Sequence, residues 1–283
     1  MTFFNSAKIA ISIYIWDISS HEIFEIRLSA TFGCPGLFSL KICKKEENMK
    51  IVVDKANSRG YANHGWLKTH HTFSFANYYN PQRVHFGKLR VLNDDTLSPG
   101  EGFDMHPHKN MEVISIPLKG YLRHGDSIQN SEVITPGDLQ VMSAGTGIVH
   151  SEFNDSSEES LDFLQIWVFP RKENTPPLYK SYDIRPVLEK NKVAYIIAPD
   201  GEAPASINQD AWFSMGALDA GQVMEYKLHH PDHGVYLFVI EGEVEVSNTS
   251  LSKRDGAGFW ETDAITIEVL KPAKVLLMDV PMH

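Results

Sequence analysis

Residues 100–112 decide the fold and read Gly-Glu-Gly-Phe-Asp-Met-His-Pro-His-Lys-Asn-Met-Glu. Two glycines open this stretch in the manner of a turn, and His106 and His108 follow them two residues apart. Residues i and i+2 of a β-strand point to the same face, so both imidazoles can aim into one interior. The stretch therefore predicts a strand that presents two metal ligands side by side.

A second pair with the same spacing follows in His150-Ser-Glu152, after the glycine-bearing turn Gly145-Thr-Gly147. The two pairs together offer three neutral nitrogens and one anionic oxygen. This ligand set suits Fe(II), Mn, Ni, Cu or Zn. Eight of the 13 histidines lie between residues 64 and 150, which indicates a site in this half of the chain.

The chain around these pairs reads as short β-branched and aromatic runs separated by Gly, Pro, Asn and Asp. No 15-residue window shows an apolar stripe with helical spacing. The pattern predicts an all-β fold of the sandwich or barrel type. The clearest expected strands are Leu89–Leu92, Val113–Leu118, Leu139–Met142, Leu161–Phe169, Val193–Ala198, Trp212–Leu218, Val235–Ile240, Glu243–Ser247, Ala264–Val269 and Lys274–Val280.

The two halves of the chain resemble each other. Gly120 follows one apolar run and Gly242 follows another, each in a turn that leads to a further strand. A duplicated β-domain explains this similarity. The strand pattern lapses over residues 171–192, so we expect domains at 49–170 and 193–283 with a connection between them.

The first 48 residues differ from the rest, since they hold both cysteines, Cys34 and Cys43, and five acidic residues balance five basic ones. The net charge of −10 thus belongs to residues 49–283. We interpret Met49 as the natural start and residues 1–48 as an N-terminal extension outside the fold. A secretory or mitochondrial leader does not fit this acid-containing segment.

Composition excludes several classes of protein. Acidic residues outnumber basic ones by 36 to 26, so the electrostatic attraction that drives nucleic-acid binding is missing. No apolar run approaches the roughly 20 residues that span a bilayer. Two cysteines cannot build a disulfide framework and fit a reducing compartment. We expect a monomeric cytoplasmic protein without a nucleic-acid or membrane partner.

At these residues the chain resembles the cupin superfamily and, within it, the pirin family. Its first cupin motif resembles Gly100, His106-Pro-His108, Glu112 and Gly120, with one extra residue before the last glycine. The second resembles Gly137, Gly145, His150 and Asn154, with Ser143 in place of proline and a two-residue expansion. Stretches similar to bacterial quercetinase-like pirins are Arg59–Trp66, His71–Ala76, Asn93–Asp95, Gln140–Gly145 and Gln165–Trp167.

The resemblance implies two tandem cupin-type β-barrels, a bicupin, and one divalent transition metal, most often Fe(II). It places the metal on His106, His108, His150 and Glu152. Pirins take the carboxylate from the second motif, whereas most other cupins take it from the first. Glu112 is therefore the competing ligand, and its alternative role is a buried hydrogen-bond partner.

The resemblance implies a quercetin 2,3-dioxygenase. Glu152 would take the 3-hydroxyl proton of a flavonol, O2 would add across C2 and C4, and carbon monoxide and a depside would leave. Aromatic residues that can line a pocket for a flat polyphenol, or pack in the core, are Phe73, Phe75, Phe103, Phe153 and Trp167. The alternative function is a non-catalytic iron-binding regulator that acts through protein partners.

Other histidines have more ordinary roles. We expect His64, His70 and His71 to pack or support the site, and His124 to form hydrogen bonds at its edge. The group His229, His230 and His233 resembles a second metal site, but no further histidine follows until His283. We therefore expect the C-terminal barrel to be free of metal.

Overall fold

The structure is a computed structural model that describes residues 8–17, 22–31, 40–44, 49–199 and 201–283. The chain divides into two compact units, Met1–Met49 and Lys50–His283. In the first unit, three antiparallel strands pair in the order β1-β2-β3, with bounds β1 Lys8–Asp17, β2 Glu22–Thr31 and β3 Leu40–Lys44. Cys34 lies outside the described residues, and the interpretation of residues 1–48 as an extension outside the fold stays a prediction.

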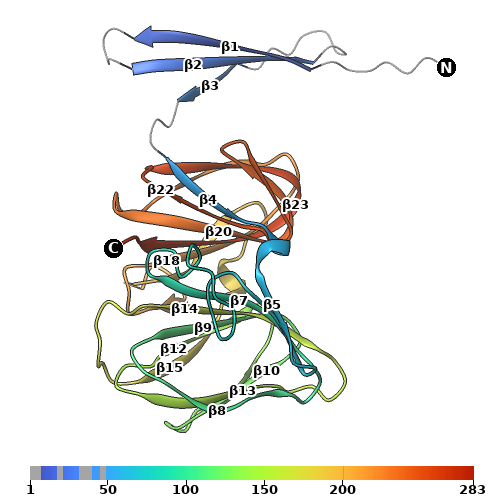
Figure 1. The fold of residues 1–283 in the computed structure, drawn as a ribbon, viewed down its shortest axis with the longest axis vertical. Coiled ribbons are helices and arrows are strands. Elements are labelled where there is room, and N and C mark those ends of the chain that lie inside the picture. The colour runs from blue at the N-terminus through green and yellow to red at the C-terminus, as the bar shows by residue number, and fades with distance from the viewer. Residues whose placement is uncertain (1–7, 18–21, 32–39, 45–48, 200) are drawn as a thin grey trace, which may run out of the picture. The chain divides into compact units, whose positions relative to one another are not determined.

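The second unit is built of β-strands and two 3₁₀ turns, η1 (Ala56–Ser58) and η2 (Arg185–Val187), and its described residues include no α-helix (Figure 1). The prediction of an all-β chain is confirmed. Its N-terminal half contains two sheets. The four-stranded sheet has the order β11 (Ser131–Ile134), β10 (Leu122–Asp126), β13 (Ile148–Asn154), β8 (Gly102–His108). The seven-stranded sheet has the order β15 (Leu178–Asp183), β12 (Asp138–Ser143), β9 (Glu112–Lys119), β14 (Leu161–Val168), β7 (Leu89–Leu97), β6 (Leu67–His71), β5 (Gly60–Asn63).

The C-terminal half forms one nine-stranded sheet. Its main path is β17 (Ala205–Ser206), β16 (Val193–Ala198), β18 (Trp212–Leu218), β23 (Ala264–Pro281), β20 (His233–Val246), β22 (Gly256–Trp260), β4 (Lys50–Asp54). Two further strands, β19 (Val223–Lys227) and β21 (Thr249–Ser252), pair with β23 and β20. Figure 1 shows this half through its orange and red strands β20, β22 and β23.

Strand pairing differs from the expected organisation at two places. Strand β4 pairs with β22, so the first strand of the second unit belongs to the sheet of the C-terminal half. Strand β15 lies within the expected connection 171–192 and pairs with β12 along its whole length. Both strands gain backbone partners from segments far along the chain, and no local pattern records such pairings. The domain boundaries at 170 and 193 stay a prediction.

Two long strands replace four of the expected ones. The runs 235–240 and 243–247 are one strand, β20, and the runs 264–269 and 274–280 are one strand, β23. The pair remains hydrogen-bonded through register shifts near Glu241 and Glu243. These irregularities bend the strands without ending them, because bulges increase local twist while pairing continues on both sides.

The proposed internal duplication has a counterpart in backbone geometry. Gly120 and Gly242 have φ values of 84° and 87°, a region that side chains rarely adopt. A Cβ on Gly120 would lie 2.8 Å from the Ser160 carbonyl oxygen, and one on Gly242 would lie 2.1 Å from that of Pro272. In each half, the glycine thus permits a tight turn that lies against a neighbouring strand.

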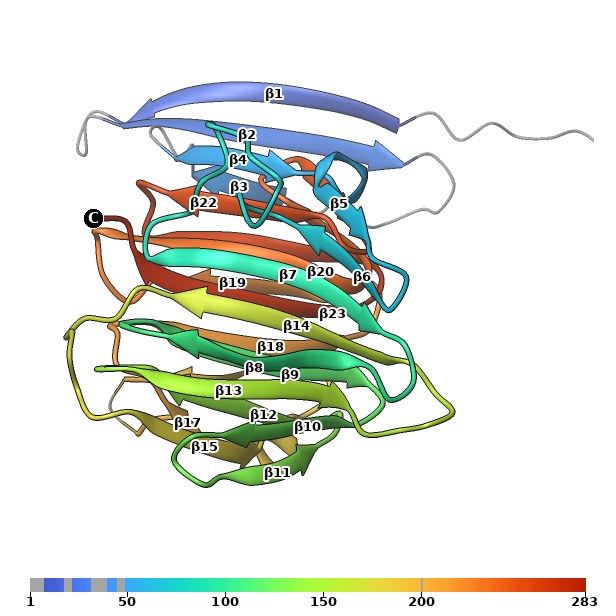
Figure 2. The same ribbon diagram turned by 60° about the horizontal axis from the view of Figure 1, so that its bottom comes forward.

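The two sheets of the N-terminal half pack face to face. One cluster joins Leu122 and Ile134 of the four-stranded sheet to Leu97 and Phe163 of the seven-stranded sheet. Alternation along β13 buries His150, Glu152 and Asn154 and leaves the residues between them partly exposed. Figure 2 shows β8, β13 and β10 running side by side. The inward face of β13 therefore carries the polar residues of the site.

Candidate metal centre

Three histidines converge at the pairing of β8 with β13. His106 lies directly opposite His150 in the antiparallel register, and His108 lies one pleat farther along β8. Their candidate ligand atoms all lie within 4.8 Å of one another, and the ring centroids are 4.5–4.9 Å apart. Within the described ranges, this is the one ready-made group of three side chains with metal-ligating atoms.

Hydrogen bonding leaves these imidazoles ready to bind. His106 Nδ1 lies 2.7 Å from the Asp104 carbonyl oxygen, which can only accept, so Nδ1 carries the proton and Nε2 keeps its lone pair. His150 is fully buried, and neither of its ring nitrogens has a hydrogen-bond partner among the described residues. Buried polar atoms are normally paired, so the unpaired nitrogens indicate a place for a ligand.

The surroundings also keep the imidazoles of His108 and His150 neutral, as metal ligation requires. Burial, followed by the nearby His150 and His106, lowers the pKa of His108 to about 4. Burial, followed by His106 and His124, lowers the pKa of His150 to about 3. Both side chains are therefore available as neutral nitrogen donors throughout the physiological pH range.

Glu152 lies two residues beyond His150 on the same face of β13 and is buried. Its Oε1 accepts hydrogen bonds of 2.6 Å from Ser115 Oγ and from Gln140 Nε2, and its Oε2 accepts one from Gln165 Nε2. A carboxylate has about four acceptor positions. Three are occupied, so one position on Oε2 remains for a metal ion or for the proton of a bound hydroxyl.

The three donors to Glu152 come from β9, β12 and β14 of the facing sheet, and sequence reasoning did not identify their role. Tyr179 extends the network, since its hydroxyl donates to Gln140 Oε1 over 3.2 Å. No local sequence pattern indicates that the three donors contact Glu152. Two of them do fall in the stretches Gln140–Gly145 and Gln165–Trp167, which resemble bacterial pirins.

Glu112 is also buried, and its carboxylate has other partners. Its Oε2 accepts hydrogen bonds from Ser143 Oγ at 2.6 Å and from the Asn208 backbone N–H at 3.2 Å. Burial raises the pKa of Glu112. Neither Glu112 nor Glu152 belongs to the group of three histidines whose ligand atoms lie within 4.8 Å of one another. Glu152 is the better candidate for the fourth ligand because it shares the inward face of β13 with His150, and the choice between the two carboxylates stays a prediction.

The expected aromatic residues fall into two sets. Trp167 contacts His108 edge to face at 4.8 Å and packs against Phe75, while Phe103 lies 6.3 Å from His106. Phe73 instead packs against Tyr236 of the C-terminal half. Phe153 alternates away from the inward face of β13 and lies under Arg123. Trp167, Phe75 and Phe103 therefore lie on the side of the histidines, whereas Phe73 and Phe153 do not.

The other histidines of this half take supporting positions. His124 stacks on Tyr179 at 3.8 Å, lies 5.4 Å from His150 and donates from Nε2 to Asp126. His71 is buried and donates from Nδ1 to Asn93 over 2.9 Å. His64 is exposed. The close packing of His124 against His150 is tighter than the edge position that the sequence indicated.

The residues present fit a divalent transition metal. Three imidazoles, with Glu152 two residues beyond His150 on the same face of β13, match the preferences of Fe(II), Ni and Zn, and one of the two buried unpaired nitrogens of His150 would bind such an ion. A cleft of about 400 Å³ opens beside His108, lined also by Pro107, Lys109, Ser127 and Gly147–Val149. Of the four candidate ligands, His108 is the one that lines this cleft.

Comparison with known proteins agrees with this geometry. The Pirin family matches residues 52–168, and the quercetinase C-terminal cupin domain matches residues 195–280. The described residues contain no helix that is long and apolar enough to cross a membrane.

Similar proteins cover most of the chain. A protein named quercetin 2,3-dioxygenase from Escherichia coli (strain K12) is 41% identical over 231 residues, which is 82% of this chain and 99% of the relative. A pirin-like protein from Caulobacter vibrioides is 39% identical over 222 residues, 78% of this chain and 95% of the relative.

Among solved structures, the bacterial pirin YhhW from Escherichia coli in complex with nickel(II) superposes with a TM-score of 0.78 at 39% identity. The match covers 82% of this chain and 99% of that one. The relatives therefore include a metal-bound pirin of the same fold. On the strength of this identity, coverage and shared fold, the chain belongs to the pirin family of cupin proteins.

Proposed function

We propose that this pirin is a metal-dependent dioxygenase that uses O2 to open the central ring of quercetin-like flavonols and releases carbon monoxide. The observation that carries the proposal is the convergence of His106, His108 and His150, with Glu152 two residues beyond His150 on the same face of β13 and one acceptor position left on its Oε2. The names of the relatives support the same reaction class. The scarcity of cysteine supports a reducing, cytoplasmic setting.

We assign the metal to His106, His108, His150 and Glu152, with Fe(II) as the first choice. When bound, the metal would supply a Lewis acid that lowers the pKa of a hydroxyl placed beside it. Because Oε2 keeps a single acceptor position, Glu152 would use it either to hold the metal or to accept the proton of the flavonol 3-hydroxyl. Ser115, Gln140 and Gln165 hold the carboxylate in place while it does so.

The surrounding residues bind and orient the substrate. Trp167 and Phe75 meet edge to face at 5.2 Å beside His108, and each ring offers an apolar face. A polyphenol needs such a surface together with a few fixed polar groups. The cleft beside His108 admits the substrate and O2, and Lys109 at its rim can pair with a phenolate oxygen.

The test is to incubate the Fe(II)-loaded protein with quercetin and O2 and to follow flavonol absorbance and carbon monoxide. We expect bleaching with release of carbon monoxide, and loss of both in the His106→Ala variant. The Glu152→Gln variant should retain bound metal and lose most of the rate, because glutamine cannot take the proton. Retained metal with no bleaching above the His106→Ala control would contradict the proposal and favour the non-catalytic regulator.

A further inference from the structure

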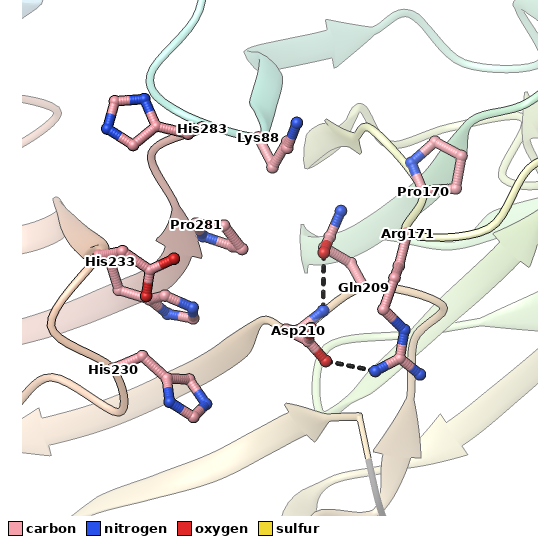
Figure 3. Close-up of a pocket in the computed structure, with 10 residues that line it drawn as sticks. Lys88, Pro170, Arg171, Gln209, Asp210, His230, His233, Pro281 and His283 are labelled. Atoms are coloured by element: carbon pink, nitrogen blue, oxygen red, sulfur yellow. Dashed lines mark hydrogen bonds and ion pairs between the residues drawn. The ribbon is translucent and has the colours of Figure 1, made fainter.

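A pocket that the proposed function does not use lies where the C-terminal half meets Lys88, Pro170 and Arg171. It has a volume of about 480 Å³ and is lined by Lys88, Pro170, Arg171, Gln209, Asp210, His230, Asp232, His233, Pro281 and His283. Figure 3 shows the imidazoles of His230 and His233 on one wall, across from Asp210 and Arg171. The sequence predicted no metal in this half because no second group of ligand residues follows these histidines.

A β-turn places the two histidines side by side. The sequence His230-Pro-Asp232-His233 closes with a hydrogen bond of 3.1 Å from the His233 backbone N–H to the His230 carbonyl. Pro231 at the second turn position restricts the backbone, which preorganises the turn. The two ring centroids lie 4.8 Å apart, within the range of 4.5–4.9 Å found among the histidines of the first centre.

A buried carboxylate orients His233. Its Nδ1 lies 2.6 Å from Asp279 Oδ1, and Asp279 is fully buried on β23. Burial by itself would raise the pKa of Asp279, but hydrogen bonds from His229 and His233 outweigh it and hold that pKa below its usual value. An ionised carboxylate can only accept, so Nδ1 carries the proton and His233 Nε2 keeps a lone pair. This carboxylate–imidazole arrangement commonly supports metal-ligating histidines.

Two further side chains of the turn are available to bind a ligand. The His230 ring and the Asp232 carboxylate are exposed and form no hydrogen bond or ion pair with any described residue. Asp232 does not yet group with the two imidazoles as a ready-made third ligand, but an exposed carboxylate can rotate toward them. On the opposite wall, Asp210 pairs with Arg171 and neutralises its charge, and Lys88 has no ion-pair partner among the described residues.

We propose that His230, Asp232 and His233 form a second, weaker binding site for a divalent transition metal such as Zn²⁺. Two imidazoles and one carboxylate from a single turn match the ligand preferences of Zn²⁺, Ni²⁺ and Cu²⁺, with water completing the coordination. The site is distinct from the three-histidine centre because it lies on the turn that enters β20 and depends on a carboxylate of β23.

The experiment uses the full chain, stripped of metal and equilibrated with Zn²⁺, with bound zinc measured by mass spectrometry after dialysis. The wild type should bind about two equivalents, and His230→Ala should reduce this to about one. A His106→Ala/His108→Ala protein should still bind about one equivalent, which adding His230→Ala/His233→Ala removes. The exposed His64→Ala change is the matched control and should alter neither number.

Graded variants test the individual roles. Asp232→Asn should weaken zinc binding at this site about tenfold, and Asp263→Asn, an exposed control, should not. Asp279→Asn should weaken it by about tenfold to a hundredfold, through loss of the orienting hydrogen bond. If the His106→Ala/His108→Ala protein binds no zinc, or if His230→Ala leaves its zinc content unchanged, the proposal is wrong. The circular dichroism spectrum of each variant verifies its fold, and the exposed His230 provides the variant least able to disturb it.

Discussion

At the scale of single residues, the three histidines combine two requirements that usually oppose each other. Metal ligands must be buried enough to exclude competing water, yet burial of an unpaired polar atom is costly. His150 is fully buried, which excludes water. Its ring nitrogens are unpaired, so the cost of burying them persists until a ligand binds. The metal-free protein should therefore be less stable than the loaded one.

Acid should destabilise the metal-free protein through His150. Its pKa is about 3 in the folded state, because of burial and then His106, and 6.5 in the unfolded chain. Below pH 6.5 the unfolded chain binds the extra proton, so the stability that neutral His150 contributes at pH 7 is lost as the pH falls toward 3. The expected contribution to the slope is about 1.4 kcal/mol per pH unit, from one proton.

Urea unfolding of metal-free protein at pH 7, 6, 5 and 4.5 measures this effect. His150→Gln removes the titrating group, so its stability should fall less steeply with acid than that of the wild type. His64→Gln, on the surface, should reproduce the wild-type slope. Identical slopes for His150→Gln and wild type would show that His150 does not titrate as described.

Gln165 should be essential for positioning Glu152. It is the one described donor to Glu152 Oε2, the oxygen that keeps an acceptor position. Replacement by the similarly sized methionine removes the donor, and we expect kcat for flavonol oxidation to fall about tenfold to a hundredfold with the fold intact. Gln209→Met, at a buried amide that donates to the Phe169 carbonyl, is the matched control. Equal effects of the two changes on kcat would rule out the positioning role.

At the scale of elements, the site depends on how closely β8 approaches β13. Gly102 begins β8, and a Cβ at this position would lie 2.3 Å from the Glu152 carbonyl oxygen and 2.5 Å from Phe153 Cα. Only the absence of a side chain permits this pairing, which sets His106 opposite His150.

Gly102→Ala should therefore push β8 away from β13. We expect the free energy of unfolding to fall by about 2–3 kcal/mol, together with a loss of bound metal. Gly125→Ala on β10 is the control, because its Cβ would meet only the Ser151 hydroxyl at 3.3 Å, and it should cost less than about 1 kcal/mol. Chemical denaturation and metal analysis of both variants decide the matter, and equal losses would contradict this account.

At the scale of the whole second unit, the two halves share one core. The largest cluster of buried side chains includes Leu92 and Ile166 from the N-terminal half and Phe213, Tyr236 and Met278 from the C-terminal half. Strand β4 adds a further connection, since it pairs with β22 of the C-terminal half and the chain then continues into β5 of the N-terminal half. Two cupin domains that share a core are expected to unfold together.

Calorimetry should accordingly show one unfolding transition for residues 50–283. Phe213→Ala removes a fully buried ring and should destabilise the unit by about 3–5 kcal/mol. Hydrogen exchange followed by mass spectrometry should show faster exchange in β13 and β14 as well as in β18. Faster exchange confined to the C-terminal half would mean that the halves are independent.

Much of the site could be predicted from local pattern. The two-residue period of a strand is a local property. Spacing alone therefore predicts that His106 and His108 share one face of their strand, and that His150 and Glu152 share one face of theirs. Short runs bounded by turn residues likewise indicated an all-β chain. The lengths of β20 and β23 were predicted wrongly, because continued pairing across a bulge depends on the partner strand and leaves little local trace.

The sequence by itself determined which side chains can ligate a metal and which face of a strand they occupy. The tertiary structure alone decided that His150 stands opposite His106, that three strands of the facing sheet supply the donors to Glu152, and that Asp279 orients His233. The physical reason is that strand register arises from long-range hydrogen bonding and shared packing. Side chains more than 40 residues apart in the chain meet only after that register is set, as His106 and His150 do.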